Sequence, residues 1–442
     1  SGLARSRTWL RARWGEATWA ELSGALGDLG TFLPLLVGLA REVGLDVGTT
    51  LVVTGVYNIA TGAMFGVPMP VQPMKSIAAI ALAEGSLSLA QVMMAGVGVS
   101  AAVWLLGVTG LIDAFNQAVP PPLVTGMQLG LGLKLASKGV GLMLLEPGGG
   151  PGYKGWAGAD GLLVAAFAAA FAVLTAAPPA GGAAGAPRRR VPTALLLVVL
   201  GLCLAMARDP GVLGGLRVGP SALQVVRPSA RDVRVGLLRG AVPQLPLTTL
   251  NSVVSVVALS EDLFPARGGV TCRSVATSVG AMNLAGCWLG VMPCCHGAGG
   301  LAAQYRFGAR TGTAVLFLGA AKLAVGLVLG SSVASLLEEF PTGILGAMLV
   351  ASALELAGTC RKVKDERDTY VMLLTAALIL FTGSTWWGFA GGAAAALLLR
   401  VQQAGPGCVP LLRTVAEPRQ AGGEQYKEVP SSAVGASPGG AV

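Results

Sequence analysis

Two short stretches of this chain combine a Met-Pro step with polar residues and a new helix start. The first reads GVPMPVQPMKSIAA at 66–79, and the second reads GVMPCCHGAGGLAA at 290–303. Prolines prevent a continuous helix through either stretch, so each predicts an extended break followed by a helix. A helix that begins inside an apolar protein directs its unpaired N–H groups and its positive dipole end toward whatever occupies the space before its first turn. Two such starts facing each other would bind an anion with little side-chain charge.

The side chains around these breaks are the candidates for contacts with an anion. They are Gln72, Pro73, Met74, Lys75 and Ser76 at the first break, Cys295, His296, Gly297 and Ala298 at the second, and Gln244, Thr248 and Asn251 in a separate polar stretch. Lys75 would add a cation, and the amides and hydroxyls could hold a tetrahedral oxyanion. The alternatives are hydrogen bonding between membrane helices for the neutral residues and a structural proline kink for one break alone. Finding two breaks in the same order favours a substrate site.

Asp28 is an acid inside the first apolar segment, in GDLGTFLP. Ionisable residues at such positions are functional candidates by default, so Asp28 is our candidate for proton coupling. The alternative is a structural ion pair with Lys75. His296, the only histidine, could respond to pH or simply contact the helix entry. Cys294 and Cys295 beside it lack the further ligands of a metal site, so we expect neither metal nor cofactor.

The composition is that of a multi-pass membrane protein. Of its 442 residues 53% are hydrophobic and only 12% are charged, against about 25% charged in soluble domains. The net charge of +9 lies mostly in clusters between apolar runs, where it would orient the chain in a bilayer rather than bind nucleic acid. No nucleophile and base are paired in the pattern, so we do not expect an enzyme. The plasma membrane and an internal, vacuolar or organellar membrane are equally open as locations.

Apolar runs predict an all-α protein with about fourteen membrane segments, two of them half-length. In the first half they lie near 22–40, 48–66, 73–84 (half-length), 89–111, 121–138, 160–177 and 192–208. In the second they lie near 243–259, 271–290, 297–306 (half-length), 311–330, 341–358, 369–382 and 385–401. Seven segments repeated once would enter the membrane from opposite sides, so the count predicts a seven-plus-seven inverted repeat.

The predicted order of parts has one internal conflict. The chain is predicted to comprise a basic N-terminal segment 1–19, a first repeat 20–208, a basic connector 209–242, a second repeat 243–401 and a disordered tail 402–442. With cytoplasmic termini residues 208–239 lie outside, yet they are rich in arginine (Arg208, Arg217, Arg227, Arg231, Arg234 and Arg239). This contradicts the usual excess of basic residues on the cytoplasmic side. An interfacial helix around 229–240 and a miscounted span are the two explanations.

Four stretches resemble the molybdate transporter family of plants and algae, which is related to the sulfate permeases. They are GDLGTFLPL at 27–35, PMPVQPMKSIAA at 68–79, PQLPLTTLNSVV at 243–254 and MPCCHGAGGLAAQYRFGAR at 292–310. The resemblance implies the fold shared with sulfate, bicarbonate and nucleobase transporters. In that fold a core domain, here 20–111 plus 243–330, carries substrate against a gate domain, here 121–208 plus 341–401.

The same resemblance implies a function. It is high-affinity molybdate transport by alternating access, with the dianion bound between the two half-helix starts. Sulfate or another oxyanion and channel-like conduction are the alternatives, and a homodimer is left open. Residues 244–251 contain no acid where related transporters often place one, which argues against carrying over their ion-coupling mechanism.

Overall fold

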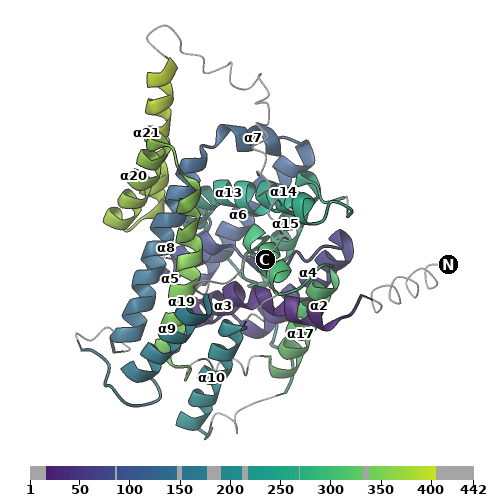
Figure 1. Cartoon of the computed structure of the whole chain (residues 1–442), viewed down its shortest axis with the longest axis vertical. Helices are drawn as coiled ribbons and strands as arrows, with labels where there is room; N and C mark the ends of the chain where they lie inside the picture. The colour runs from purple at the N-terminus through teal and green to yellow at the C-terminus, as the bar shows by residue number, and fades with distance from the viewer. Residues whose placement is uncertain are drawn as a thin grey trace, which may run out of the picture. The chain divides into compact units, whose positions relative to one another are not determined.

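The structure is a computed structural model (Figure 1) that describes residues 16–84, 87–146, 152–176, 191–211, 218–267, 269–330, 332, 337 and 339–404. Residues 1–400 form one compact unit and residues 401–442 another. Most of the predicted N-terminal segment, the arginine cluster at 188–190 and nearly all of the predicted tail lie outside the described residues. The described part of the first unit is mainly helical, with one two-stranded ribbon of three-residue strands, which confirms the all-α prediction.

The helices of the first half follow the predicted segments closely. They are α2 (Trp19–Ala25), the 3-10 turn η1 (Leu26–Asp28), α3 (Leu29–Val43), α4 (Val47–Phe65), α5 (Lys75–Glu84), α6 (Leu89–Thr109), α7 (Ile112–Ala118), α8 (Pro121–Leu144), α9 (Leu162–Ala176) and α10 (Thr193–Arg208). Among the described helices of this half, only the short α7 was not predicted by the apolar runs.

The second half begins with a bent run of consecutive helical segments. These are α12 (Ala230–Val235), η2 (Gly236–Ala241), α13 (Val242–Thr249), η3 (Leu250–Val254) and α14 (Ser255–Leu263). There follow α15 (Cys272–Gly286), η4 (Cys287–Leu289), α16 (Ala298–Arg306), α17 (Thr313–Leu329), α19 (Thr342–Ala357), η5 (Gly358–Lys362), α20 (Glu366–Thr382) and α21 (Thr385–Ala404).

Five helical stretches of the described chain are long and apolar enough to cross a membrane. They are Trp19–Val43, Val47–Phe65, Leu89–Thr109, Ala230–Leu263 and Thr342–Lys362. The chain is therefore an integral, multi-pass membrane protein.

The eighth membrane segment starts earlier than the sequence suggested. Its helix begins at Ala230 rather than near residue 243, so the last part of the expected connector is helical. Ser229 caps this start and Asp232 completes a capping box. Pro243 and Pro246 lie between two π-helical segments, η2 and η3, where regular helical hydrogen bonding is interrupted and residues without an N–H are tolerated. The charges at 231–239 shortened the apolar run, so the predicted segment began near residue 243.

Helices α4 and α17 run antiparallel with their backbones in close contact. Each presents three glycines seven residues apart, which pair as Gly62 with Gly312, Gly55 with Gly319 and Gly48 with Gly326. A Cβ on Gly55 would lie 2.8 Å from the Gly319 carbonyl oxygen, and one on Gly319 would lie 2.7 Å from that of Gly55. These faces are the small-residue contacts that membrane helices use to pack.

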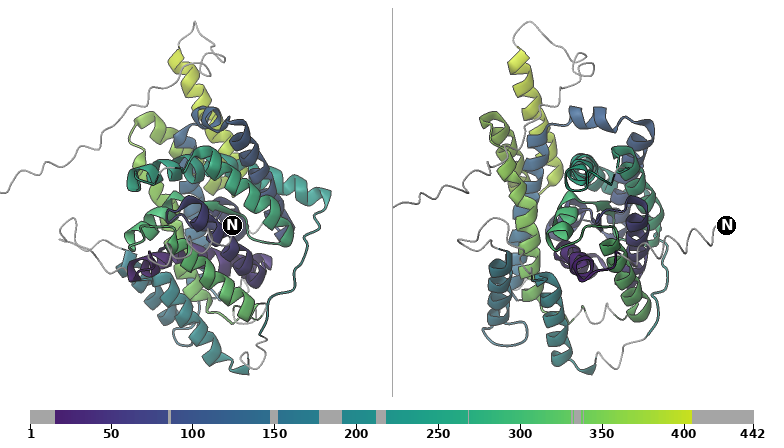
Figure 2. Two further views of the ribbon diagram at one scale, coloured as in Figure 1. Left: turned by 90° about the vertical axis from the view of Figure 1, so that its right-hand side faces the viewer. Right: turned by 45° about the vertical axis from the view of Figure 1, so that its right-hand side comes forward.

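A second group of helices packs around α8. Helix α19 lies along it, with Gly139 against Gly346, and α20 and α9 complete the group. Figure 2 (right) shows α8, α19 and α20 together at one side of the helices that surround the two breaks. The start of α19 is held by Asp160, whose carboxylate accepts hydrogen bonds from the Gly343 N–H (2.8 Å), the Thr342 hydroxyl (2.8 Å) and the Lys154 ammonium (2.9 Å).

Candidate functional site

The two predicted breaks meet and pair with each other. Strand β1 (Val71–Pro73) and strand β2 (Cys294–His296) form an antiparallel ribbon with Gln72 opposite Cys295. The Met74 N–H extends the pairing by donating to the Pro293 carbonyl at 2.8 Å. All six strand residues are buried. The half-helices α5 and α16 therefore both begin at one buried ribbon.

An asparagine from the preceding helix holds each strand. Asn58 of α4 accepts the Val71 N–H at 2.9 Å. Asn283 of α15 accepts the Cys294 N–H at 2.6 Å and donates to the Cys294 carbonyl at 2.6 Å. Each asparagine also donates to its own helix, four residues back. In both breaks, therefore, the side chain of an asparagine on the preceding helix accepts a hydrogen bond from a backbone N–H of the strand.

The side chains at the start of α5 reach the start of α16. Gln72 packs so closely against α16 that a Cβ on Gly300 would lie 2.6 Å from its Nε2, and a Cβ on Gly297 would collide with its Oε1. The Lys75 Nζ lies 3.9 Å from the Cβ position of Gly299. A side chain at Gly297 or Gly300 would collide with Gln72, whereas the distance at Gly299 is an ordinary contact.

Three buried polar atoms at this junction have no hydrogen-bond partner among the described residues. They are Gln72 Oε1, Ser76 Oγ and His296 Nδ1, on residues that are 2%, 1% and 0% exposed. Leaving such an atom unsatisfied costs about 1–3 kcal/mol, so unpaired polar atoms are rare in native interiors. The Ser76 hydroxyl can donate a hydrogen bond. His296 carries a proton on Nδ1 in the tautomer whose Nε2 accepts from Ser278 (3.0 Å), and the Pro70 backbone carbonyl competes for the ring N–H.

Asp28 is paired with Lys322, and the alternative of an Asp28–Lys75 pair is wrong. The Asp28 side chain is fully buried; its Oδ1 accepts from Gln72 Nε2 at 2.7 Å and its Oδ2 lies 3.5 Å from Lys322 Nζ. The Lys322 ammonium also lies 3.4 Å from the ring centre of Phe32. The sequence analysis missed Lys322, although a lone lysine within the apolar run 313–329 was a signal.

Lys75 instead faces Glu355 of α19. Their charged atoms are 3.7 Å apart, and the Thr31 hydroxyl donates to the same carboxylate at 3.1 Å. The side chains are 23% exposed for Lys75 and 58% for Glu355, so solvent screens this pair. The sequence did not identify Glu355 as a site residue either, because an acid near the end of an apolar segment is usually a surface residue. The contact links a half-helix start to the helix group around α8.

The remaining candidates lie around the same ribbon. Gln244 accepts the Ile77 N–H at 3.1 Å and donates to the Thr248 hydroxyl at 2.8 Å, so it caps the first turn of α5. The Ser252 hydroxyl contacts Cys295 Sγ at 3.2 Å. Asn251 lies in η3, which packs against β2. The buried Pro73 and Met74 shape the chain before α5, and Ala298 begins α16.

The described residues contain no group of three or more His, Cys, Asp or Glu side chains that could hold a metal ion. The ionisable groups at the junction are instead arranged as two ion pairs, Asp28 with Lys322 and Lys75 with Glu355. Such an arrangement can bind and exchange an anion through Lys75 and the helix starts.

Comparison with known proteins assigns the chain to a family. Residues 20–135 and 236–356 match the family described as "Molybdate transporter of MFS superfamily". The chain is 42% identical to "Molybdate transporter 1" of Chlamydomonas reinhardtii, over 85% of this chain and 90% of that protein. It is 45% identical to "Molybdate transporter 1" of Arabidopsis thaliana, over 82% and 84%. The chain belongs to the molybdate transporter family.

The ranges matched to the molybdate transporter family include both breaks and the two ion pairs of the junction. Among solved structures, the chain resembles the transmembrane domain of the cyanobacterial bicarbonate transporter BicA. The TM-score is 0.58 at 15% identity, over 86% of this chain and 97% of that one. At that identity the likeness shows a shared fold alone. The family resemblance stated from the sequence is confirmed.

Proposed function

We propose that this chain is a secondary transporter of molybdate, which it binds as a tetrahedral dianion between the starts of α5 and α16. The observation that carries the proposal is the set of unpaired buried polar atoms at the junction of the two half-helices. Membership of a family whose curated relatives are named molybdate transporters supports the choice of substrate.

The chemistry of the junction fits an oxyanion. First-turn N–H groups of a helix lack intrahelical acceptors, and in α5 only that of Ile77 is taken up by Gln244. The Ser76 hydroxyl and His296 Nδ1 add side-chain donors, while Lys75 adds charge. Gln72 Oε1 is an acceptor and would face a bridging water rather than the anion. Since Lys322 already offsets Asp28, Lys75 is the cation that a dianion would engage, in competition with Glu355.

The proposed architecture is an inverted repeat of seven plus seven segments. Its support is the symmetry of contacts, since the packing of α4 on α17 has its counterpart in that of α15 on α6, and α8 packs on α19. With the corrected helix start, the repeats span 20–208 and 230–401. The core domain (20–111 plus 243–330) would move against the gate domain (121–208 plus 341–401), and substrate would exchange across the Lys75–Glu355 contact.

Asp28 remains our candidate for proton coupling, because it is a buried acid in contact with Gln72 at the substrate junction. The Asp28→Asn variant should keep molybdate binding and flatten the pH dependence of uptake. Loss of binding, or a full pH dependence, would assign Asp28 a structural role as the partner of Lys322.

Uptake of labelled molybdate into proteoliposomes tests the function. The Ser76→Ala variant should raise the apparent KM about 10- to 150-fold, which corresponds to the about 1.5–3 kcal/mol of a hydrogen bond to a charged group. Ser100→Ala is the matched control, since Ser100 is also buried with an unpaired hydroxyl but lies in α6. Stronger competition by sulfate than by unlabelled molybdate would reassign the substrate, and sustained non-saturating current would indicate a channel.

A further inference from the structure

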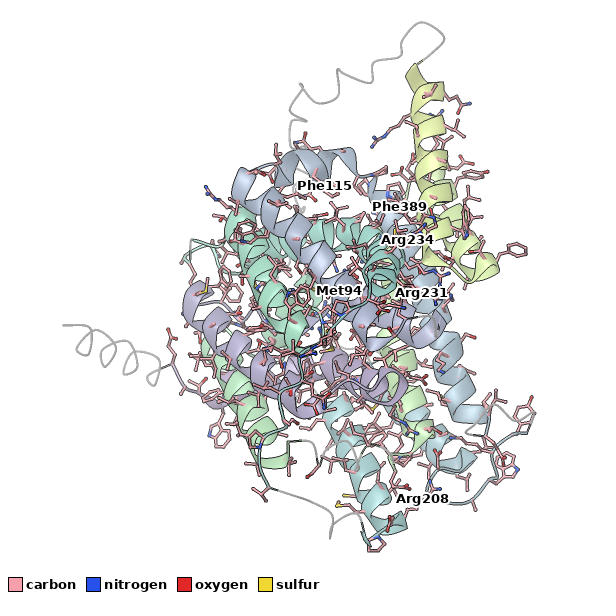
Figure 3. All side chains as sticks on the ribbon, turned by 180° about the vertical axis from the view of Figure 1, so that it is seen from behind. Met94, Phe115, Arg208, Arg231, Arg234 and Phe389 are labelled. Atoms are coloured by element: carbon pink, nitrogen blue, oxygen red, sulfur yellow. The ribbon has the colours of Figure 1, made fainter. Side chains whose placement is uncertain are left out.

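A basic cleft lies at the start of the eighth membrane helix, apart from the substrate junction. It encloses about 420 Å³ between the α12–η2 segment and the α20–α21 turn. The lining residues are Arg231, Arg234, Val235, Leu238 and Arg239 from the first side and Ser384, Trp386 and Trp387 from the second. Figure 3 shows Arg231 and Arg234 on the same side of the molecule as Phe389 of α21. We call this feature the arginine cleft.

The positive charge of the arginine cleft is not balanced by acids in its lining. Arg234 and Arg239 form no hydrogen bond or ion pair with any described residue. The acid nearest in sequence is Asp232, and its carboxylate is already engaged by Ser229 and by Gln91 of α6, the latter at 3.0 Å. Unpaired arginines gathered around a cavity favour an anionic ligand.

Tight packing on one face of the helix directs the arginines into the cleft. Gly236 lies against α6, where a Cβ would come within 2.5 Å of the Gln91 carbonyl oxygen, and Gly240 is pressed against Ala95. The arginines occupy the other side of this stretch and are exposed. They can therefore be replaced without disturbing the contact with α6.

The walls of the arginine cleft are apolar and aromatic. Val235 and Leu238 stand beside the arginines, and Trp387 is 60% exposed. The Trp386 ring lies 6.2 Å from that of Phe389. Exposed tryptophan beside arginine is typical of the membrane interface, where one part of a ligand is apolar and the other charged.

We propose that the arginine cleft binds the phosphate group of an anionic membrane lipid. The guanidinium fork matches phosphate oxygens, and the apolar walls match the glycerol and acyl portion of the same molecule. A free oxyanion would need the arginines but not the apolar walls. The arginines belong to a helix that is itself apolar enough to span a membrane, so the ligand reaches them from the bilayer. A lipid there would contact both α12–η2 and the α20–α21 turn.

Lipid retention by the full chain tests this proposal. The protein is reconstituted in phosphatidylcholine nanodiscs with a minor fraction of phosphatidylglycerol, and native mass spectrometry counts the retained lipids. Each arginine near an anionic surface contributes about 1 kcal/mol, which is about fivefold in affinity. Arg234→Gln should therefore weaken phosphatidylglycerol retention about fivefold, and the double variant Arg234→Gln with Arg239→Gln about 25-fold. Replacing both arginines with lysine keeps the charge but removes the guanidinium fork, so retention should fall, though by less than in the double glutamine variant.

Arg227→Gln is the matched control, since Arg227 is exposed on the preceding segment and does not line the cleft. It should retain phosphatidylglycerol like the wild type. Equal losses in Arg227→Gln and Arg234→Gln would overturn the proposal in favour of diffuse surface charge. Displacement of the lipid by an equal concentration of inorganic phosphate would overturn it in favour of a free oxyanion.

Discussion

Glu355 and a bound dianion would compete for the Lys75 ammonium at the start of α5. The Glu355→Gln variant should therefore lower the apparent KM for molybdate. Exposed ion pairs contribute about 0.2–1 kcal/mol, so the decrease should be at most about fivefold. Concentration-dependent uptake measures it, with Glu366→Gln, an exposed acid at the start of α20, as the control. An unchanged or raised KM would show that Glu355 does not compete with substrate.

The buried Asp28–Lys322 pair makes a second prediction about single residues. Lys322→Met leaves a fully buried carboxylate without its cation and should destabilise the protein by about 3–5 kcal/mol. Asp28→Asn combined with Lys322→Met should recover most of that loss, because neither charge remains. Thermal unfolding of both variants measures the coupling. If the double variant unfolds no later than Lys322→Met alone, the pair does not hold the fold.

For single residues, the sequence indicated which side chains lie at the junction better than it indicated which side chains they pair with. Lys75, Ser76 and His296 were identified from their place beside the breaks, and all three lie at the junction. The partner of Asp28 could not be inferred, because pairing between residues 28 and 322 depends on how distant helices pack. Two lysines lay in apolar surroundings, and only tertiary contacts decide which of them reaches the acid.

Helix α19 depends on Asp160 for its start, and this dependence has a pH signature. Burial raises the pKa of Asp160, but hydrogen bonds from Gly343, Lys154 and Thr342 outweigh it and hold the pKa below its ordinary value of 3.8. The stabilisation is therefore fully present above that ordinary pKa and is lost as the pH falls through the lower value in the folded protein. Asp160→Asn removes the charged acceptor from these hydrogen bonds and should cost about 1.5–3 kcal/mol at neutral pH.

Thermal unfolding across pH measures this effect. The gap in Tm between wild type and Asp160→Asn should be constant near neutrality and close in strong acid. A gap that stays the same at every pH at which the protein folds would show that the charge of Asp160 does not support α19.

The contact between α4 and α17 predicts a sharp difference between two glycine substitutions. Gly55→Ala should separate the helices, because its Cβ would lie 2.8 Å from the Gly319 carbonyl oxygen. Gly141→Ala in α8 meets no atom within 4 Å and should be neutral or slightly stabilising. Unfolding in detergent compares them, and equal Tm values would contradict the backbone contact as the basis of this packing.

At the scale of elements, apolar runs and prolines predicted nearly every helix and both half-helix starts. The β1–β2 ribbon was not predicted, because strands of three residues carry no periodicity and their pairing joins residues more than 200 positions apart. A helix around 229–240 was one of the two explanations offered for the basic connector, but the sequence did not indicate that this helix continues into the eighth membrane segment, as it does in Ala230–Leu263. The arginine cleft gives a physical reason for the place of its arginines on a membrane helix.

At the scale of the whole molecule, the two breaks lie beside α4 and α15, which carry Asn58 and Asn283. Glu355 lies in α19, which belongs to the helix group around α8. Substrate bound at the α5 and α16 starts would therefore sit where the proposed core and gate domains touch. Relative motion of the two domains would expose it alternately, since Lys75 and Glu355 belong to opposite sides of that contact. The same arrangement predicts that molybdate stabilises the protein against unfolding and that Ser76→Ala weakens this effect.

The most direct measurement is the position of molybdenum in a structure of the chain with bound molybdate, located by anomalous scattering at the molybdenum edge. The metal atom should lie between the first turns of α5 and α16, within reach of Ser76 and the N–H groups of Ala298 and Gly299. A molybdenum atom more than one helical turn from both starts would contradict the site and the transport mechanism built on it.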